Sequence, residues 1–209
     1  MIPCRFIGAC AALVGAAVLT AAFAVQDKGK EAKPAAAPSG ADPAMMAKWT
    51  AFMTPGPDHK VLEPLVGKWT AHVKMWMDPA APPMESDGTS EIQWIMGNRY
   101  LQERHKGTVM NMPFEGQGTV GFDNLKKKYV MTWVDNMGTG IMTAEGTYDS
   151  AKKSVSYATT CPDATMSKYV SGRLVDTFVD ANTYKMEMFG PDASGKEFRS
   201  MEITYTRAK

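Results

Sequence analysis

The sequence predicts an all-β protein, an antiparallel up-and-down β-barrel of about ten strands preceded by a short N-terminal helix. Two observations lead to this prediction. From His59 onward, apolar and polar residues alternate with a period of two, as in half-buried strands. The alternating stretches are joined by short turns rich in Gly, Asn, Asp and Pro, with no helical period between them. Evenly spaced strands with short connections favour a meander that closes on itself, because closure removes exposed edges.

Residues 1–24 have the pattern of a secretory signal peptide. Arg5 supplies a positive charge, an apolar run follows, and Ala22-Phe23-Ala24 fits the small-x-small rule of signal peptidase. We therefore expect an exported protein, periplasmic or secreted, that does not span a membrane once this segment is removed. Lipidation at Cys10 is the alternative to cleavage at Ala24, but Cys10 comes before the apolar run has formed.

Two further segments are expected before the barrel. Residues 25–41 are rich in Ala, Pro and Lys and lack an apolar period, which predicts a disordered linker. Residues 42–54 begin with Asp42-Pro43, an N-cap followed by Pro at the first helical position, and predict a short amphipathic helix. Its apolar face is expected to pack on the core or to cover an open barrel end, with a membrane or partner contact as the alternative. This face comprises Met45, Met46, Trp49, Phe52 and Met53.

The barrel domain is expected over residues 58–207. Its ten strands are predicted at residues 67–77, 88–96, 99–108, 115–122, 127–135, 139–148, 153–160, 168–179, 182–189 and 196–206. Methionine is frequent in these strands, and its flexible thioether suits either core packing or an adaptable apolar binding surface. The strand methionines are Met75, Met77, Met96, Met131, Met186, Met188 and Met201.

One hairpin can be placed in register from the sequence. If Gly97-Asn98 is a two-residue turn, Met96 faces Arg99, and Glu91 lies opposite Arg104 as a favourable charge pair. The face that carries this pair also carries Gln93, Gln102 and Lys106, so it is expected to meet solvent, unlike the apolar outside of a transmembrane barrel. The interior face is expected to carry Ile92, Trp94, Met96, Leu101, Glu103 and His105.

Charge and cysteine content narrow the function classes. The formal net charge is +1, with no basic run with interleaved aromatics, so no nucleic-acid partner is expected. Removal of the signal peptide leaves Cys161 as the last of three cysteines, so no disulfide framework is expected. The thiol is expected at a strand end, before Pro162, without a histidine base nearby. The oligomeric state stays open.

Several motifs of the barrel region carry a family resemblance. Gly67-Lys68-Trp69 opens the first strand and Arg207 closes the last, which resembles the calycin barrels, where a basic residue covers this Trp at the closed end. A cation over an indole contributes about 1 kcal/mol. Longer runs occur in order: PGPDHKVLEPLVGKW, MDPAAPPMESDGTSE, MGNRYLQERHKGTVMNMPFEGQGTVGFDNLKKKYVMTWVDNMGTG and MTAEGTYD. They resemble the domain-of-unknown-function 1579 family, DUF1579. This resemblance implies a calycin-like or lipocalin-like barrel, often exported, with no established activity and no catalytic residues to carry over.

Candidate site residues lie on the presumed interior face. Glu103 and His105 are two apart on one strand, so they could act as base and acid, or could hydrogen-bond inside a small polar pocket. Trp133 and Asp135 share a face, where they could orient a ligand at the barrel mouth, although Asp135 could equally shape the turn after its strand. With Trp94, these are the predicted ligand-binding residues, and no catalytic residue is assigned.

No metal or cofactor is predicted. The three histidines, His59, His72 and His105, fall on a loop and on two different strands, with His72 facing outward. Nitrobindin-like barrels, to which calycin-like barrels are similar, hold haem through a histidine of the C-terminal part, but residues 106–209 contain none.

Three functions remain open from the sequence. The preferred one is a non-enzymatic barrel holding a small apolar or amphipathic ligand, with a cavity that touches Trp94, Glu103, His105 and Trp133. The second is a hydrolase or isomerase that works through Glu103 and His105. The third is a packed structural domain that acts through its surface, because barrels of this type host many functions.

Overall fold

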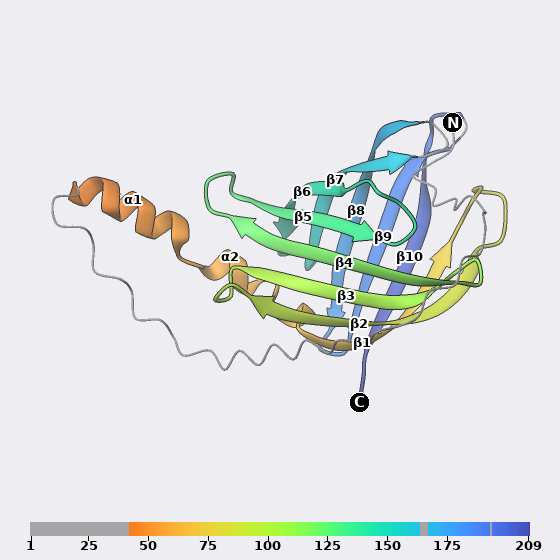
Figure 1. The fold of residues 1–209 in the computed structure, drawn as a ribbon, viewed down its shortest axis with the longest axis horizontal. Helices are drawn as coiled ribbons and strands as arrows, with labels where there is room; N and C mark the ends of the chain where they lie inside the picture. The colour runs from red at the N-terminus through yellow and green to blue at the C-terminus, as the bar shows by residue number, and fades with distance from the viewer. Residues whose placement is uncertain (1–41, 164–166, 193) are drawn as a thin grey trace, which may run out of the picture.

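The computed structural model describes residues 42–163, 167–192 and 194–209, and Figure 1 shows their arrangement. The predicted signal peptide, residues 1–24, and linker, residues 25–41, lie outside the described residues. Helix α1 (Pro43–Met53) and helix α2 (Pro57–Lys60) are followed by a 3-10 turn, η1 (Glu63–Leu65). Ten strands follow: β1 (Gly67–Met75), β2 (Met84–Ile95), β3 (Tyr100–Val109), β4 (Met112–Asp123), β5 (Lys128–Asp135), β6 (Met142–Asp149), β7 (Ser154–Asp163), β8 (Lys168–Asp180), β9 (Thr183–Pro191) and β10 (Glu197–Arg207).

The ten strands form a closed antiparallel barrel in which each strand pairs with its neighbours in sequence and β1 pairs with β10. Strand β1 shows why the alternation produces this fold. Trp69, Ala71, Val73 and Met75 are buried while the residues between them are exposed or half-buried, so every second side chain enters the interior. The predicted fold class, an up-and-down barrel of about ten strands after a short helix, is confirmed.

Some strand ends differ from the prediction. Strand β2 starts at Met84, earlier than expected, because its polar residues pair with the outer face of β1: His72 lies 3.1 Å from Glu85 and 2.9 Å from Asp87. After Met84, the first residues of β2 are polar or small on both faces, so they show no alternation of apolar and polar residues from which a strand could be predicted. Strand β7 continues to Asp163, so Cys161 lies within the strand and is buried.

The β2–β3 hairpin has the predicted register but a longer turn. Glu91 lies opposite Arg104, as expected, and the last pair is Ile95 with Tyr100. Met96, Gly97 and Asn98 all adopt positive φ angles, of 51°, 65° and 61°. The turn therefore includes Met96 and Arg99, which a two-residue turn would have left in the strands. Met96 is consequently 72% exposed, and its predicted place in the interior was wrong.

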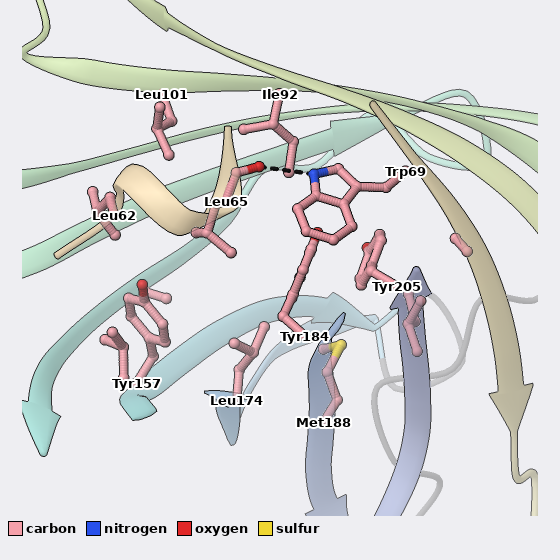
Figure 2. Close-up of a cluster of buried hydrophobic side chains, with 14 of the residues drawn as sticks. Leu62, Leu65, Trp69, Ile92, Leu101, Tyr157, Leu174, Tyr184, Met188 and Tyr205 are labelled. Atoms are coloured by element: carbon pink, nitrogen blue, oxygen red, sulfur yellow. Dashed lines mark hydrogen bonds between the residues drawn. The ribbon is translucent and has the colours of Figure 1, made fainter. Parts of the chain in front are cut away.

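One end of the barrel is closed by a packed layer of large side chains (Figure 2). The indole of Trp69 donates a hydrogen bond of 2.8 Å to the carbonyl oxygen of Leu65 in η1, and Tyr184 packs edge-on against it with ring centroids 4.9 Å apart. Tyr184 in turn stacks on Tyr205, at 4.1 Å and an interplanar angle of 7°. Together these side chains fill the barrel below its polar residues, because aromatic rings bury large areas in few positions.

The last residue of β10 holds this end together. The guanidinium of Arg207 lies 4.2 Å from the centre of the Trp69 ring. It also donates three hydrogen bonds to carbonyl oxygens, those of Ala181 at 3.0 Å, Val66 at 2.8 Å and Pro64 at 3.1 Å. Arg207 therefore joins η1, β1 and the β8–β9 turn.

Helix α1 projects away from the barrel (Figure 1). None of its residues is buried, and Trp49 is 52% exposed. Its C-terminal end is held by Asn124 in the β4–β5 turn, whose amide donates to the carbonyl oxygens of Ala51, Phe52 and Thr54 at 3.0–3.1 Å. That turn lies at the closed end, so the expectation that α1 packs on the core or covers an open end was wrong. None of the described helices is long and apolar enough to cross a membrane.

Candidate functional site

The interior of the barrel holds a cavity of about 590 Å³. It extends from the closed end to the opposite end, where the β3–β4, β5–β6 and β7–β8 connections surround its mouth. Most of the wall is apolar and comes from inward residues of the strands, among them Val73, Val120 and six strand methionines. Those methionines are Met75, Met131, Met142, Met186, Met188 and Met201. Soft thioether walls of this kind can adapt to ligands of different shape.

Glu103 of β3 carries the central polar contacts of this cavity. Its Oε1 accepts a hydrogen bond of 2.7 Å from the Ser90 hydroxyl and one of 3.4 Å from the Tyr205 hydroxyl. Burial raises the pKa of the Glu103 carboxyl, and these two hydrogen bonds only partly oppose the shift. Its second oxygen, Oε2, makes no hydrogen bond to a residue that the structure describes, which leaves it available toward the cavity.

Asp176 of β8 also lines the cavity and was not predicted from the sequence. The residue is only 7% exposed, and its carboxyl makes no hydrogen bond within the described part of the chain. Burial, followed by the nearby charge of Glu103, raises the pKa of Asp176 to about 8. A carboxyl in such surroundings keeps its proton at neutral pH, because isolated charges are costly in an apolar interior.

His105 completes the polar group on β3. The Ser90 hydroxyl has one proton, which it donates to Glu103, so its oxygen accepts from the Nδ1–H of His105 at 2.9 Å. The His105 ring fits because Gly88 and Gly107 face it: a Cβ atom at Gly88 would lie 2.8 Å from Nε2. Burial lowers the pKa of His105, which keeps the imidazole neutral. Glu103 and His105 thus face one cavity, but Ser90 bridges them.

Trp133 lies flat against the wall of the barrel near the mouth. A Cβ atom would come within 2.2 Å of the indole at Gly116 and within 3.1 Å at Gly118, so the indole occupies the space that two side chains of β4 leave open. Its Nε1 donates a hydrogen bond of 3.0 Å to Oδ2 of Asp135, while Oδ1 of Asp135 accepts from the backbone N–H of Met137 at 2.9 Å. Asp135 therefore both positions the indole and shapes the turn, and both residues line the cavity.

Trp94 does not line this cavity. Its indole instead donates a hydrogen bond of 2.7 Å to Glu63 in η1 and packs beside the core at the closed end. The parity of β2 directs Trp94 inward, but η1 occupies the barrel end at this level. The expectation that the cavity touches Trp94 was therefore wrong.

The other histidines are far from a shared site. His59 is buried beside Phe122, with its Nδ1 accepting from the backbone N–H of Gly56 at 3.1 Å. His72 lies on the outside, where its hydrogen bond to Asp87 is the main cause of a raised pKa. Within residues 42–163, 167–192 and 194–209, no three His, Cys, Asp or Glu side chains converge in a way that could hold a metal ion.

The interior polar residues that sequence reasoning missed carry a detectable signal. Asp176 has the same strand parity as Leu174, which is buried, so it is an acid within an inward-facing apolar series. Ser90 likewise shares the parity of Ile92, and Tyr205 that of Ile203. Extending the parity argument from one hairpin to all ten strands would have placed all three inside.

Comparison with known proteins supports the fold. The model of the family described as "Protein of unknown function (DUF1579)" matches residues 54–207, which confirms the resemblance stated above. None of the curated proteins matches the chain. Rv2717c from M. tuberculosis is similar in structure, with a TM-score of 0.55 and 12% identity over 75% of this chain and 100% of that one. The S-type phycobiliprotein lyase CPES from Guillardia theta has a TM-score of 0.50 and 10% identity over 73% of this chain and 93% of its own. At these identities the likeness shows the fold alone.

Proposed function

Because this chain belongs to the DUF1579 family of proteins of unknown function, we propose a function from its own interior: an exported, non-enzymatic barrel that holds a small apolar or amphipathic molecule. Export rests on the signal-peptide pattern of residues 1–24. The structural likeness to the lyase from Guillardia theta supports the proposal only in that a barrel of similar fold occurs in a protein named for an activity on phycobiliproteins. The binding proposal rests on the cavity.

The single observation that carries this proposal is the size and lining of that cavity. Its volume of about 590 Å³ lies in the range of about 300–1,000 Å³ typical of small-molecule sites. The wall is mostly apolar, and Glu103, His105 and Asp176 are among its few polar groups. This combination is what a ligand with an apolar body and one polar group requires.

The test uses N-phenyl-1-naphthylamine, a neutral apolar dye whose fluorescence rises when it leaves water. Val120 on β4 lines the cavity, and Val120→Trp should fill part of it. Val134 on the adjacent β5 is 43% exposed on the outer face, so Val134→Trp is the matched control. We expect the wild type and the control to bind the dye, and the Val120 variant to bind at least about tenfold more weakly. Equal binding by all three proteins, or no binding by the wild type, would refute the proposal.

An enzymatic function is a second candidate, because Ser90 connects Glu103 and His105 inside one cavity. The hydroxyl donates to the carboxylate, however, and not to the imidazole, so His105 does not serve as the base of a Ser–His pair in this arrangement. Hydrolysis of p-nitrophenyl butyrate separates the two functions. We expect no hydrolysis above the level of the Ser90→Ala variant. A rate that Ser90→Ala and His105→Gln both abolish would favour the enzyme.

A further inference from the structure

We propose that the polar group inside the barrel selects a lipophilic amine, with the protonated amino group held between Glu103 and Asp176 and the apolar body in the upper cavity. This inference rests on the proposed binding function and names the class of ligand. It starts from a feature that packing alone does not explain: two of the carboxyls that line the cavity, those of Glu103 and Asp176, lie on opposite walls of its deep part.

Asp176 is the first observation. It is more than nine-tenths buried, lines the cavity and makes no hydrogen bond to any residue in the described ranges. Nearly all buried carboxyl groups in proteins have a partner, and an uncompensated one destabilises the fold. A ligand that donates hydrogen bonds at this position would supply the partner that the Asp176 carboxyl lacks among the described residues.

The second observation is the position of Glu103 relative to Asp176. Around the closed ring, four strands separate β3 from β8 in either direction, so the two carboxyls belong to opposite walls. They are nevertheless close enough for the charge of Glu103 to act on Asp176. A group bound between them would contact both walls of the barrel.

The third observation is the lack of an internal cation. Among the described residues that line the cavity, the basic side chains are His105 and Lys168. Lys168 is exposed at the mouth, and the imidazole of His105 is neutral because burial lowers its pKa. Arg207 is engaged with Trp69 and three carbonyl oxygens at the closed end. The deep part of the cavity that the structure describes therefore has carboxyl groups without a cation.

An alkylammonium group fits these acids. Like the lysine ammonium, it carries three N–H donors and no acceptor, and the deep cavity offers Oε2 of Glu103 and the oxygens of Asp176. Asp176 is protonated at neutral pH without a ligand, and an ammonium group beside it favours its ionised form, so binding of the amine releases this proton. Charge-assisted hydrogen bonds of this type are about twice as strong as neutral ones.

The same arrangement disfavours an anionic amphiphile. A fatty acid placed with its head group in the deep cavity would bring a third carboxyl to a site without a cation, which like-charge repulsion opposes. An alcohol of equal chain length would gain the apolar contacts, among them the exposed face of Trp133, but no charge-assisted hydrogen bond. The expected order of affinity is therefore amine, then alcohol, then carboxylate.

The experiment is displacement of N-phenyl-1-naphthylamine from the mature protein at neutral pH by decylamine, decanol and decanoate, each below its critical micelle concentration. We expect decylamine to compete at least about tenfold more strongly than decanol, and decanoate to compete least. Binding of the dye with equal competition by all three, or stronger competition by decanoate, would overturn the amine proposal alone. If the dye does not bind, the binding function itself fails, so the two failures are distinct.

Matched variants test which side chains cause the preference for decylamine over decanol. Asp176→Asn and Glu103→Gln keep the shape of the side chains but cannot ionise beside the amine, so we expect both to lose most of the preference for decylamine over decanol, each measured against that variant's own dye affinity. Glu91→Gln changes an acid on the outside of β2, paired there with Lys68, and should keep that preference. A preference unchanged in all three variants would show that the amine is recognised elsewhere and would overturn the proposal.

Discussion

Glu103 and Asp176 reach into one cavity from opposite walls of the barrel, with four strands between them on either side. They mark the level at which the interior changes. Toward the closed end, Trp69, Tyr184 and Tyr205 pack into a continuous core (Figure 2). Toward the mouth, the space is open and is lined by both apolar and polar residues, among them Trp133 and Asp135. The interior of the barrel is therefore a packed core at the closed end and an open cavity toward the mouth.

Asp176 should make the protein less stable as the pH rises. In the unfolded chain its carboxyl titrates near its ordinary value of about 3.9, whereas the fold raises the pKa to about 8. Between these values the unfolded state has lost a proton that the folded state keeps, so the free energy of unfolding falls by about 1.4 kcal/mol per pH unit. Above pH 8 this contribution becomes constant.

Asp176→Asn removes this contribution. The variant should gain stability relative to the wild type as the pH rises from 4 to 8, as measured by urea unfolding at several pH values. Glu91→Gln, on the outer wall, serves as the control and should follow the wild type. Parallel pH profiles for the Asp176 variant and the wild type would contradict the inferred burial.

Arg207 should stabilise the closed end through hydrogen bonds as well as its charge. Loss of three hydrogen bonds and one cation–π contact in Arg207→Met is expected to lower the free energy of unfolding by about 2–4 kcal/mol. Arg207→Lys keeps a cation near Trp69 but lacks the planar guanidinium that reaches three carbonyl oxygens, so it should recover less than half of that loss. Urea midpoints of the three proteins check this, and full recovery by lysine would show that charge alone matters.

Gly116 should be required for the open mouth. Because an added Cβ would lie 2.2 Å from the Trp133 indole, Gly116→Ala should push that ring into the cavity, with a stability loss of about 1–3 kcal/mol. We expect weaker binding of the apolar dye and a change in tryptophan fluorescence. Gly138 lines the same mouth with nothing within 4 Å of an added Cβ, so Gly138→Ala should leave both signals unchanged. Equal behaviour of the two variants would argue against the position of Trp133.

Helix α1 should contribute little to the stability of the barrel. It buries no residue, and the hydrogen bonds described to it from the barrel come from Asn124. Deleting residues 42–54 from a protein that comprises residues 42–209 is expected to change the melting temperature by no more than a few degrees. A large loss would mean that its apolar face is covered in solution.

Strand parity explains how much of this structure could be predicted from the sequence. It placed Glu103, His105 and Trp133 inside, and all three line the cavity. It failed for Trp94 and Met96, because parity gives the direction of a side chain but not what η1 occupies or where a turn begins. The shared cavity of Glu103 and Asp176 was beyond a single hairpin, since it depends on closure across the whole barrel.

The central claim, that the barrel is a container, can be tested by NMR of methyl-13C methionine during titration with N-phenyl-1-naphthylamine. The chain carries its own reporters: Met131, Met186 and Met201 line the cavity, whereas Met96 and Met110 are 72% and 51% exposed. We predict that ring currents of the bound dye shift the three cavity methyl signals and leave the two exposed ones in place. Shifts confined to Met45 and Met53 of the exposed helix α1, with the cavity signals unmoved, would contradict the claim.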